Sequence, residues 1–543
     1  MTFLFVSLTP LNEETQNSRQ LKWIITVLVL LVSAFFLFAR LGHYALWDDE
    51  ANTALIAQGV WQTGDTSAVV GDNLVAFRDG WTLKNLHERA TPPLSFYLTA
   101  PFIGLLGETA WAARLPFALC GFGTVLLILR WLWRDRASVL TWVLVAMGLL
   151  GNVSFFLFNR QCRYYALVQL LTTALAYLYF HFDRPRKILG FALLSVALLA
   201  ANYLAFAAFW ACLAVDFALC GRKRLVLSRT HWLSLSLPQL ALGLPLVWVW
   251  NPWATTVGGS FARSTLAEKM MDVWWSILGM STSEFGVIAL LVIAPLLFWR
   301  SRDVRLWRIP LALAIYLLTV SLVSPLKSTI AEVRYYTPTI PLWIYLGVVV
   351  IQTVAARRSW LALVLGVITF GSNFFQGGWF LGYGGVVITL RSTPILYLKE
   401  LLSPPGDPYT VTAGWINQHL PPKATVAVVP DYMMYPLMFH APKQVYAWQL
   451  KGSANQFPTL PRIHFEGEQR PDYIIIFGPM VTKMTGIVQT RDGTLFHYDR
   501  VAVLNCFWRD LYRPELFLRT WKPVTGFDPG QNAIYIFRRT EEK

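Results

Sequence analysis

The sequence predicts a polytopic α-helical membrane protein with about eleven transmembrane helices and a small extracytoplasmic α/β domain at its C-terminal end. Three observations predict this class. Of the 543 residues, 55% are hydrophobic and only 14% are charged, whereas soluble domains carry about 25% charged residues. Apolar runs of span length recur up to about residue 380. From about residue 404, short apolar runs bounded by turn residues replace them, as in buried strands.

The first apolar run, residues 21–39, is long enough to cross a hydrocarbon core about 30 Å thick as a helix. A polar stretch precedes it and no small-residue cleavage site follows, so we expect a retained first span. Ten more runs have the same character. The eleven expected spans are 21–40, 108–133, 138–157, 165–182, 188–202, 204–220, 232–250, 284–299, 309–324, 338–355 and 360–380.

The distribution of basic residues predicts the orientation of these spans. Clusters of Arg and Lys recur at every second connection, within 130–136, 184–187, 222–229, 300–308 and 357–358. By the positive-inside rule these connections are cytoplasmic. The N-terminus is then cytoplasmic, and an odd number of spans places the C-terminus outside the plasma (inner) membrane. The net charge of +15 is therefore mostly topological, and we expect membrane lipid but no nucleic acid as a partner.

The expected outer side contains one long loop and one separate domain. The loop, residues 41–107, includes a short apolar run with prolines at its start, 91–107, which indicates an interfacial or re-entrant helix. We therefore divide the chain into a multispan domain, 1–400, and an outer domain, 404–543. In the outer domain the sequence predicts an amphipathic helix at 412–420 and buried strands at 424–432, 471–479, 500–507 and 532–539.

Acidic residues gather in the first outer loop, and cations lie where other spans reach the same side. The ionisable residues expected there are Asp48, Asp49, Glu50, Asp65, His87, Glu88, Arg89, Arg160, Arg163, Lys327, Glu332 and Arg334. Arginine forks suit a phosphate carried by a lipid and can stabilise the charge on a leaving group. A carboxylate beside them suits a general base for an incoming hydroxyl. The pattern therefore favours group transfer at the outer membrane surface.

Each of these groups also has a simpler interpretation. Asp48 or Asp49 fits the N-cap of a helix that starts at Glu50, where the helix end would keep a carboxylate ionised. The stretch 163–165, Arg-Tyr-Tyr, fits snorkelling and an interfacial tyrosine belt. Glu332 and Arg334 fit a structural ion pair. His87 and the acids near it leave a divalent metal ion open as a cofactor.

Four motifs in chain order resemble the glycosyltransferase family 39 group of GT-C enzymes. "WDDEANTALIAQGVWQTGD", 47–65, resembles the first-loop signature, and "TPPLSFYL", 91–98, resembles the start of the interfacial helix. "NRQCRYYAL", 159–167, is similar to the second-loop motif, and "EVRYYTPTIPLW", 332–343, to a later one. This group includes the aminoarabinose lipid A transferase and the protein O-mannosyltransferases. The resemblance covers most of the chain.

The resemblance implies an inverting transferase that uses a polyprenyl-phosphate sugar as donor. It implies that Asp49 is the catalytic base, that Glu50 is its neighbour in the site, and that Arg163 and Arg334 bind the donor phosphate. Lys327 and Arg89 are further phosphate candidates, and the other candidates are His87, Glu88, Arg160, Tyr164, Glu332 and Tyr335. Many relatives have Lys or His just before the paired prolines, where this chain has Thr91. Arg89 or His87 would then take that role.

We therefore expect a membrane glycosyltransferase whose acceptor is a hydroxyl or phosphate on a lipid, a glycan or a protein. The alternatives are a transporter or flippase for lipid-linked sugars and a non-catalytic envelope scaffold. A flippase predicts ionisable groups at mid-membrane and repeated halves with broken spans. In this sequence the acids gather in an outer loop, and no internal repeat is evident.

Overall fold

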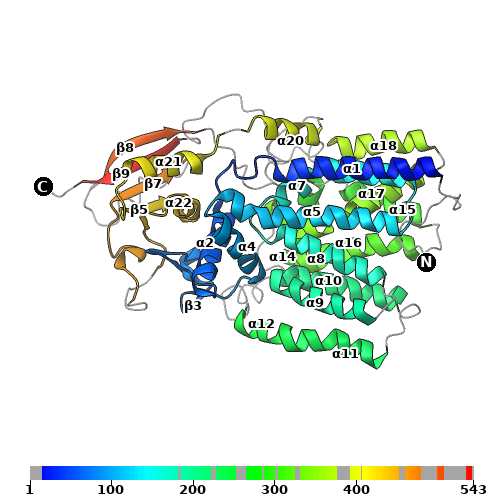
Figure 1. Ribbon diagram of the computed structural model, residues 1–543, viewed down its shortest axis with the longest axis horizontal. Helices are drawn as coiled ribbons and strands as arrows, with labels where there is room; N and C mark the ends of the chain where they lie inside the picture. The colour runs from blue at the N-terminus through cyan, green and yellow to red at the C-terminus, as the bar shows by residue number, and fades with distance from the viewer. Residues whose placement is uncertain are drawn as a thin grey trace.

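The computed structural model describes residues 15–181, 185–221, 228–251, 265–283, 287–299, 304–323, 330–356, 358–375, 390, 392–404, 406–451, 459–478, 498–506 and 533–540. The protein is elongated and mostly helical. Helices lie side by side along its long axis, a small sheet lies at one end, and α2 and α4 lie between the two parts (Figure 1).

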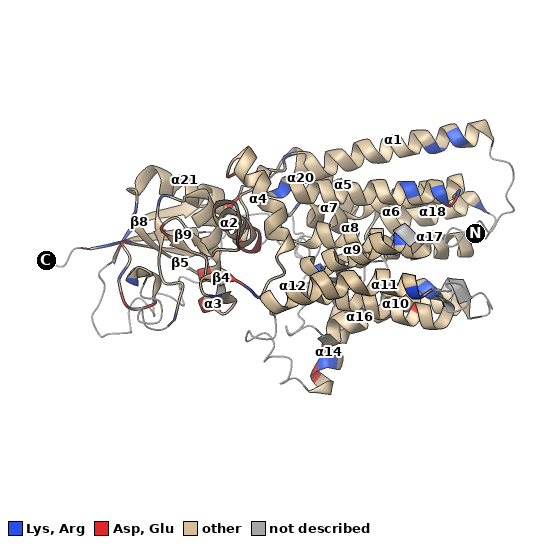
Figure 2. Cartoon of the chain, turned by 60° about the horizontal axis from the view of Figure 1, so that its bottom comes forward, with Lys and Arg blue, Asp and Glu red and all other residues tan. Residues whose placement is uncertain are grey.

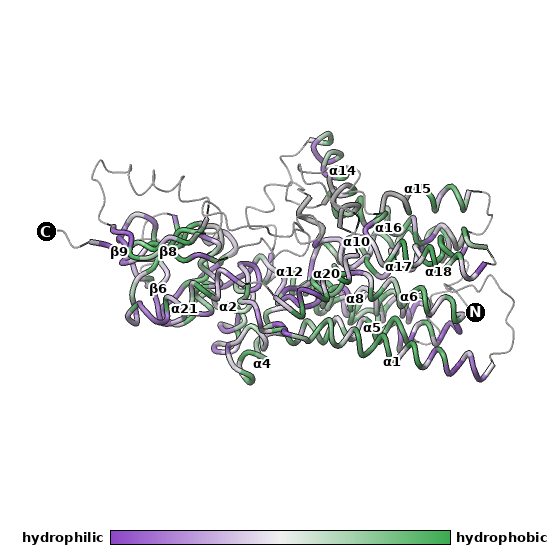
Figure 3. Tube along the Cα trace, turned by 90° about the horizontal axis from the view of Figure 1, so that it is seen from above, coloured by the Kyte–Doolittle hydropathy of each residue, from purple (hydrophilic) through white to green (hydrophobic). Residues whose placement is uncertain are grey.

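The helical part contains a helix within each of the eleven apolar ranges. Its helices are α1 (Gln16–Phe38), α5 (Ala110–Arg134), α6 (Val139–Gly151), α7 (Val153–Asn159), α8 (Tyr165–Phe180), α9 (Pro185–Ala201), α10 (Tyr203–Asp216), α11 (Arg229–Pro238), α12 (Leu244–Val249), α14 (Leu266–Ser283), α15 (Val287–Phe298), α16 (Val304–Val323), α17 (Ile340–Ala355), α18 (Ser359–Gly371) and α20 (Thr393–Leu402). A 3₁₀ segment, η4 (Ile330–Thr339), precedes α17. Hydrophobic residues cover most of α5 and the middle of α1 (Figure 3).

Four of the described helices are long and apolar enough to cross a membrane, or five if a bent pair counts as one span. The bent pair is α6 and α7, which meet at an angle of 57°. Asn152 causes the break, because its backbone leaves the helical conformation and its side chain caps the amide of Phe155. Six further apolar helices have 10 to 17 residues. The count of eleven spans therefore stays a prediction.

The first outer loop folds into a small subdomain. It contains α2 (Asp48–Thr63), the hairpin of β1 (Val69–Val70) and β2 (Asn73–Leu74), α3 (Phe77–Gly80), the hairpin of β3 (Leu83–Lys84) and β4 (His87–Glu88), and α4 (Leu94–Leu106). Gly64 ends α2 at a φ of 77°, in the left-handed region that glycine adopts without strain. Helix α4 begins directly after the paired prolines, as the sequence predicted. The sequence reasoning missed both hairpins.

The C-terminal part contains a five-stranded sheet of order β6-β5-β7-β9-β8. The strands are β5 (Thr425–Val429), β6 (Val445–Tyr446), β7 (Tyr473–Phe477), β8 (Tyr498–Asn505) and β9 (Ala533–Arg539), and the helices beside them are α21 (Pro408–His419) and α22 (Met434–His440). β5 runs parallel to β6 and β7, whereas β9 runs antiparallel to β7 and β8.

One expectation about this sheet needs correction. The stretch 500–507 was expected as a buried strand, but no residue of β8 is buried. β8 is an edge strand that pairs with β9; Ala502 and Leu504 are only partly buried against the shared core, and Val501 and Val503 are exposed. The sequence reasoning also missed β6, α20 and α22, which are short.

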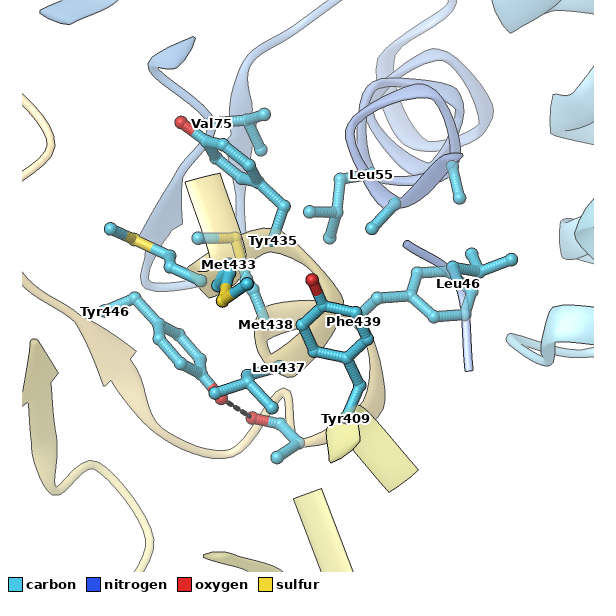
Figure 4. Packing of buried hydrophobic residues seen from close by; sticks show 14 of the residues in the cluster. Leu46, Leu55, Val75, Tyr409, Met433, Tyr435, Leu437, Met438, Phe439 and Tyr446 are labelled. Carbon is cyan, nitrogen blue, oxygen red and sulfur yellow. Dashed lines mark hydrogen bonds between the residues drawn. The ribbon is translucent and has the colours of Figure 1, made fainter. Parts of the chain in front are cut away.

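The sheet and the first outer loop share one hydrophobic core. The cluster includes Leu46, Leu55 and Val75 from the loop, and side chains of α21, α22, β5, β6, β7 and β9 from the C-terminal part. Figure 4 shows the loop side chains facing Tyr435, Met438 and Phe439 of α22 across this core. Burial of this shared apolar surface fixes the loop against the C-terminal part.

Candidate active site

The carboxylate of Asp49 lies between two arginines from distant parts of the chain. Its Oδ2 is 2.9 Å from Nη1 of Arg334 and 3.4 Å from Nη2 of Arg163. Asp49 is in the first turn of α2, Arg163 is in the link between α7 and α8, and Arg334 is in η4. The side chains are 16%, 15% and 14% exposed, respectively. The structure thus brings together three residues that the sequence motifs singled out separately.

Local bonds orient this group. Helix α2 begins at Asp48, so its N-cap is Trp47 rather than either aspartate, which corrects the capping expectation. The Asp48 carboxylate instead accepts the amide of Asp49 at 2.8 Å. Arg163 donates from Nη1 to the hydroxyl of Thr53 at 3.0 Å. Asp48 thus binds within its own turn, and the Asp49 carboxylate faces the two arginines.

The group carries an excess of positive charge. Burial by itself lowers the pKa of Arg163, but the Asp49 carboxylate raises it, and the net direction is upward. Arg163 therefore remains charged although its side chain is largely buried. Among the described residues, its Nε has no hydrogen-bond acceptor. Two guanidiniums facing one carboxylate leave capacity for a further anion.

Glu50, the neighbour of Asp49, does not face this group. Its carboxylate is fully buried, at 2.8 Å from Nε and 2.5 Å from Nη2 of Arg114 on α5. It also accepts the backbone amides of Cys162 at 2.7 Å and Trp47 at 3.3 Å. The expectation that Glu50 takes part in the chemistry is therefore not supported, because all its contacts join structural elements. Our sequence reasoning missed Arg114, although an arginine inside the apolar run 108–133 is a usable signal.

A second acid–arginine pair lies elsewhere in the same loop. Arg89 donates to both carboxylate oxygens of Asp65, at 2.9 and 2.6 Å, and lies over the ring of Trp250 at 5.0 Å. The hydrogen bond from Arg89 is the main reason that the pKa of Asp65 is lowered. Nε2 of His87 is 3.7 Å from the same carboxylate. Arg89 is thus engaged by Asp65, which does not support its expected role in binding the donor phosphate.

Glu88 and Thr91 form a closed turn. The Glu88 carboxylate accepts the hydroxyl of Thr82 at 2.6 Å and the amides of Ala90 and Thr91 at 3.0 and 2.9 Å. Burial raises the pKa of Glu88. Thr91 therefore supports the turn before the paired prolines through its backbone amide.

Of the remaining candidates, one arginine binds the end of a helix and two tyrosines lie beside the arginines that face Asp49. Arg160 donates to the carbonyls of Phe36 and Ala39, both at 2.7 Å, and so satisfies the end of α1. The rings of Tyr164 and Tyr335 lie under the guanidiniums of Arg163 and Arg334, at 5.6 and 5.4 Å. Lys327 and the Glu332 side chain lie outside the described residues. Within the described ranges, no cluster of three or more His, Cys, Asp or Glu could hold a metal ion.

An apolar cavity of about 150 Å³ lies within the helical part. Its lining comes from α5, α6, α8, α10, α16 and α17, and from Pro338 and Thr339 of η4. It therefore includes the segment that carries Arg334. Asp216 and Arg308, an ion pair with an Oδ2–Nη2 distance of 2.6 Å, also border it.

Comparisons with known proteins support the fold. No family model matches the sequence, and no curated protein matches it. The structure is similar to that of ArnT from Cupriavidus metallidurans bound to undecaprenyl phosphate, with a TM-score of 0.54 and 13% identity, over 95% of this chain and 97% of that one. The Archaeoglobus fulgidus oligosaccharyltransferase in complex with Zn and sulfate gives a TM-score of 0.52 and 10% identity, over 95% and 88%.

The two likenesses extend over nearly the whole of this chain. An apo structure of the same ArnT gives a TM-score of 0.52. The chain therefore has the fold of the GT-C membrane glycosyltransferases, as the four motifs predicted.

Proposed function

We propose that this protein is an inverting membrane glycosyltransferase. It moves a sugar from a polyprenyl-phosphate donor to a hydroxyl or phosphate acceptor on the extracytoplasmic face. The observation that carries the proposal is the Asp49 carboxylate held between Arg163 and Arg334. The GT-C fold supports it, because this fold is shared with an ArnT that was solved with undecaprenyl phosphate.

The reaction with a hydroxyl acceptor is a single displacement. The acceptor oxygen attacks the anomeric carbon of the sugar, and the bond from that carbon to the phosphate oxygen breaks. The acceptor proton goes to the carboxylate of Asp49. The polyprenyl phosphate leaves with the bonding electrons, and Arg163 and Arg334 stabilise its added charge. Attack opposite the leaving group inverts the anomeric configuration.

The arginines and the cavity account for donor binding. The buried Nε of Arg163 has no acceptor among the described residues, so it offers a donor to a phosphate oxygen. Arg334 offers a second guanidinium from the other side of Asp49. The apolar cavity that Pro338 and Thr339 help to line takes part of the isoprenoid chain. The phosphate then lies at the membrane surface while its chain stays in apolar surroundings.

The charge distribution supports an extracytoplasmic site. Lys and Arg gather at the ends of α1, α11 and α18 that lie far from the sheet (Figure 2). By the positive-inside rule those ends are cytoplasmic, so the first loop and the sheet are outside. We propose eleven spans, a cytoplasmic N-terminus and an outer C-terminal α/β domain on this basis.

The experiment that tests the function compares envelope lipids by mass spectrometry. Cells carry the wild-type protein, an Asp49→Asn variant at equal abundance, or no protein. We expect the variant and the deletion to accumulate one polyprenyl-phosphate sugar and to lose the same glycosylated product. Those two species would identify the donor and the acceptor.

The opposite outcome points to another function. If Asp49→Asn behaves like the wild type while the deletion changes the lipids, then Asp49 is not the base. A transporter for lipid-linked sugars or a scaffold would then account for the phenotype.

A further inference from the structure

The backbone that leads to Asp49 is held from two sides. Residues 41–47, here named the strap, join α1 to α2. On the membrane side, Arg114 donates from Nη1 to the carbonyls of Leu41 and Tyr44, at 3.1 and 2.8 Å, and from Nη2 to that of Ala45 at 2.9 Å. One buried guanidinium thus binds the carbonyls of the strap and also pairs with Glu50.

The C-terminal part binds amides of the same strap. The backbone N–H of Ala45 donates to Oδ2 of Asp407 at 2.5 Å, and the N–H of Leu46 donates to Nε2 of His440 at 3.1 Å. Asp407 is buried and is the N-cap of α21, and His440 is the last residue of α22. These two side chains lie 362 and 394 residues along the chain from the amides that they hold.

The rest of this contact leaves little freedom between the two parts. The side chain of Asn73 accepts the amide of Tyr446 and donates to the carbonyl of Gln444, both at 2.8 Å. The Ala76 amide donates to the side chain of Gln449 at 3.2 Å. The shared core, with Phe439 of α22 beside Leu46 of the strap, lies next to these bonds (Figure 4). The C-terminal part therefore contacts the strap and the rest of the loop through several hydrogen bonds and a shared core.

From these contacts we infer that Asp407 and His440 are positioning residues that set the place of Asp49 against Arg163 and Arg334. This inference rests on the proposed function. The strap ends one residue before α2 begins, so a shift of Ala45 and Leu46 moves the first turn of α2. A misplacement of about 1 Å can lower a rate about 100-fold. The C-terminal part is then a component of the catalytic machinery.

The chemistry of His440 makes the inference testable by substitution. Its Nε2 must carry no proton to accept the amide of Leu46. Burial, and then the charge of Arg114, lower the pKa of His440 to about 4, while Asp407 acts in the opposite direction. Glutamine offers an acceptor oxygen at a similar reach, whereas leucine fills the volume without one. The two substitutions therefore separate the hydrogen bond from the packing.

The experiment uses the full chain with His440→Leu and His440→Gln. We measure product per protein in cells by mass spectrometry, binding of undecaprenyl phosphate to the purified protein, and deuterium exchange of the amides of residues 41–60. For His440→Leu we expect product formation to fall about 10- to 100-fold, lipid phosphate binding to change less than threefold, and exchange at the strap to rise. His440→Gln should restore product formation to within about threefold of the wild type.

Two matched variants control for general loss of structure. His419→Leu removes an exposed histidine of α21 that stacks on Trp415. Asp472→Asn weakens the contacts with Thr425 and Arg539 inside the sheet. Both should keep product formation and strap exchange near the wild type. If His440→Leu fails to accumulate, Asp407→Asn replaces it. The Asp407 carboxylate accepts the amides of Ala45 and Tyr409 and the hydroxyl of Thr410, and an asparagine side chain offers these donors fewer acceptor sites.

The outcomes separate the two proposals. If the wild type makes product and His440→Leu matches it in turnover and exchange, the positioning role is wrong and the transferase stands. If Asp472→Asn loses as much product as His440→Leu, the effect is general destabilisation and the positioning role is wrong. A third outcome is that neither Asp49→Asn nor His440→Leu alters the lipids, while deuterium exchange at the strap still rises in His440→Leu. The transferase proposal then fails. His440 would still hold the strap, but its role in positioning a catalytic residue would be overturned.

Discussion

Asp49 and Glu50 are adjacent in the chain, yet the structure places them in two different environments. Asp49 faces Arg163 and Arg334 from two other segments and is 16% exposed. Glu50 is fully buried against Arg114 and two backbone amides. Successive residues of a helix point about 100° apart, so the same turn directs one carboxylate toward Arg163 and Arg334 and the other toward Arg114 on α5. Asp49 thus faces two arginines from distant segments, whereas Glu50 joins α2 to α5 and to the link between α7 and α8.

The strongest test of this difference between Asp49 and Glu50 is to remove each charge separately. We expect Asp49→Asn to lower the rate of product formation by roughly 10²- to 10⁴-fold, because a general base contributes that much. The melting temperature of the purified protein should fall by less than in Glu50→Leu, because Asp49, Arg163 and Arg334 keep some exposure, whereas Glu50 is fully buried against Arg114. Rates are measured with the donor identified from the lipid comparison.

The matched control for that prediction is Asp65→Asn, which removes a carboxylate bound to Arg89 in the same loop. It should keep at least a third of the wild-type rate. A loss equal to that of Asp49→Asn would mean that any acid–arginine pair of this loop supports activity equally.

Glu50 should respond in the opposite way. Glu50→Leu leaves Arg114 buried without its carboxylate, which costs about 3–5 kcal/mol in comparable buried pairs. We expect a lower melting temperature and less protein in the membrane, measured by fluorescence scanning and by quantitative blotting. The double variant Glu50→Leu with Arg114→Leu should recover part of the loss. Additive losses in the double variant would show that the pair is not coupled.

The arginines that face Asp49 should control lipid phosphate affinity. Arg334→Gln removes hydrogen bonds to a charged group, each worth about 1.5–3 kcal/mol, so we expect undecaprenyl phosphate to bind roughly 10- to 100-fold more weakly. Arg89→Gln should leave the affinity unchanged, because Arg89 is engaged by Asp65. Equal losses in the two variants would place the phosphate elsewhere. Titration of purified protein in detergent measures both affinities.

The smallest expected effect is the contribution of His440 to the pH dependence of the melting temperature. The pKa of His440 is lowered in the folded state to about 4, from roughly 6.5 in an unfolded chain. Neutral His440 therefore contributes its full stabilisation above pH 6.5 and loses it as the pH falls toward 4. The melting temperature should fall less between pH 7 and pH 4.5 in His440→Gln than in the wild type, by roughly 2 °C. His419→Gln should follow the wild type, and identical curves for His440→Gln and wild type would contradict the linkage.

The sequence predicted much of the fold because the relevant signals are local. Each apolar range contains a helix, and residues 424–432, 471–479 and 532–539 contain β5, β7 and β9. The position of β8 along the chain was predicted correctly, but its burial was not. Apolar residues alone do not show whether a strand lies at the edge of a sheet. The hairpins β1–β2 and β3–β4 have two residues per strand, which is too short for a periodic pattern.

The sequence by itself determined the membrane class, the positions of the helices and the motif residues Asp49, Arg163 and Arg334. Composition and hydrophobic runs suffice for the class and the helices, and the resemblance of four motifs to the glycosyltransferase family 39 group singled out the three residues. Only the tertiary structure decided that Glu50 is buried with Arg114, that Arg89 belongs to Asp65, and that Asp407 and His440 hold the strap. The physical reason is that a buried charge or amide takes whichever partner the packing brings near, and no local pattern encodes a partner more than 360 residues away.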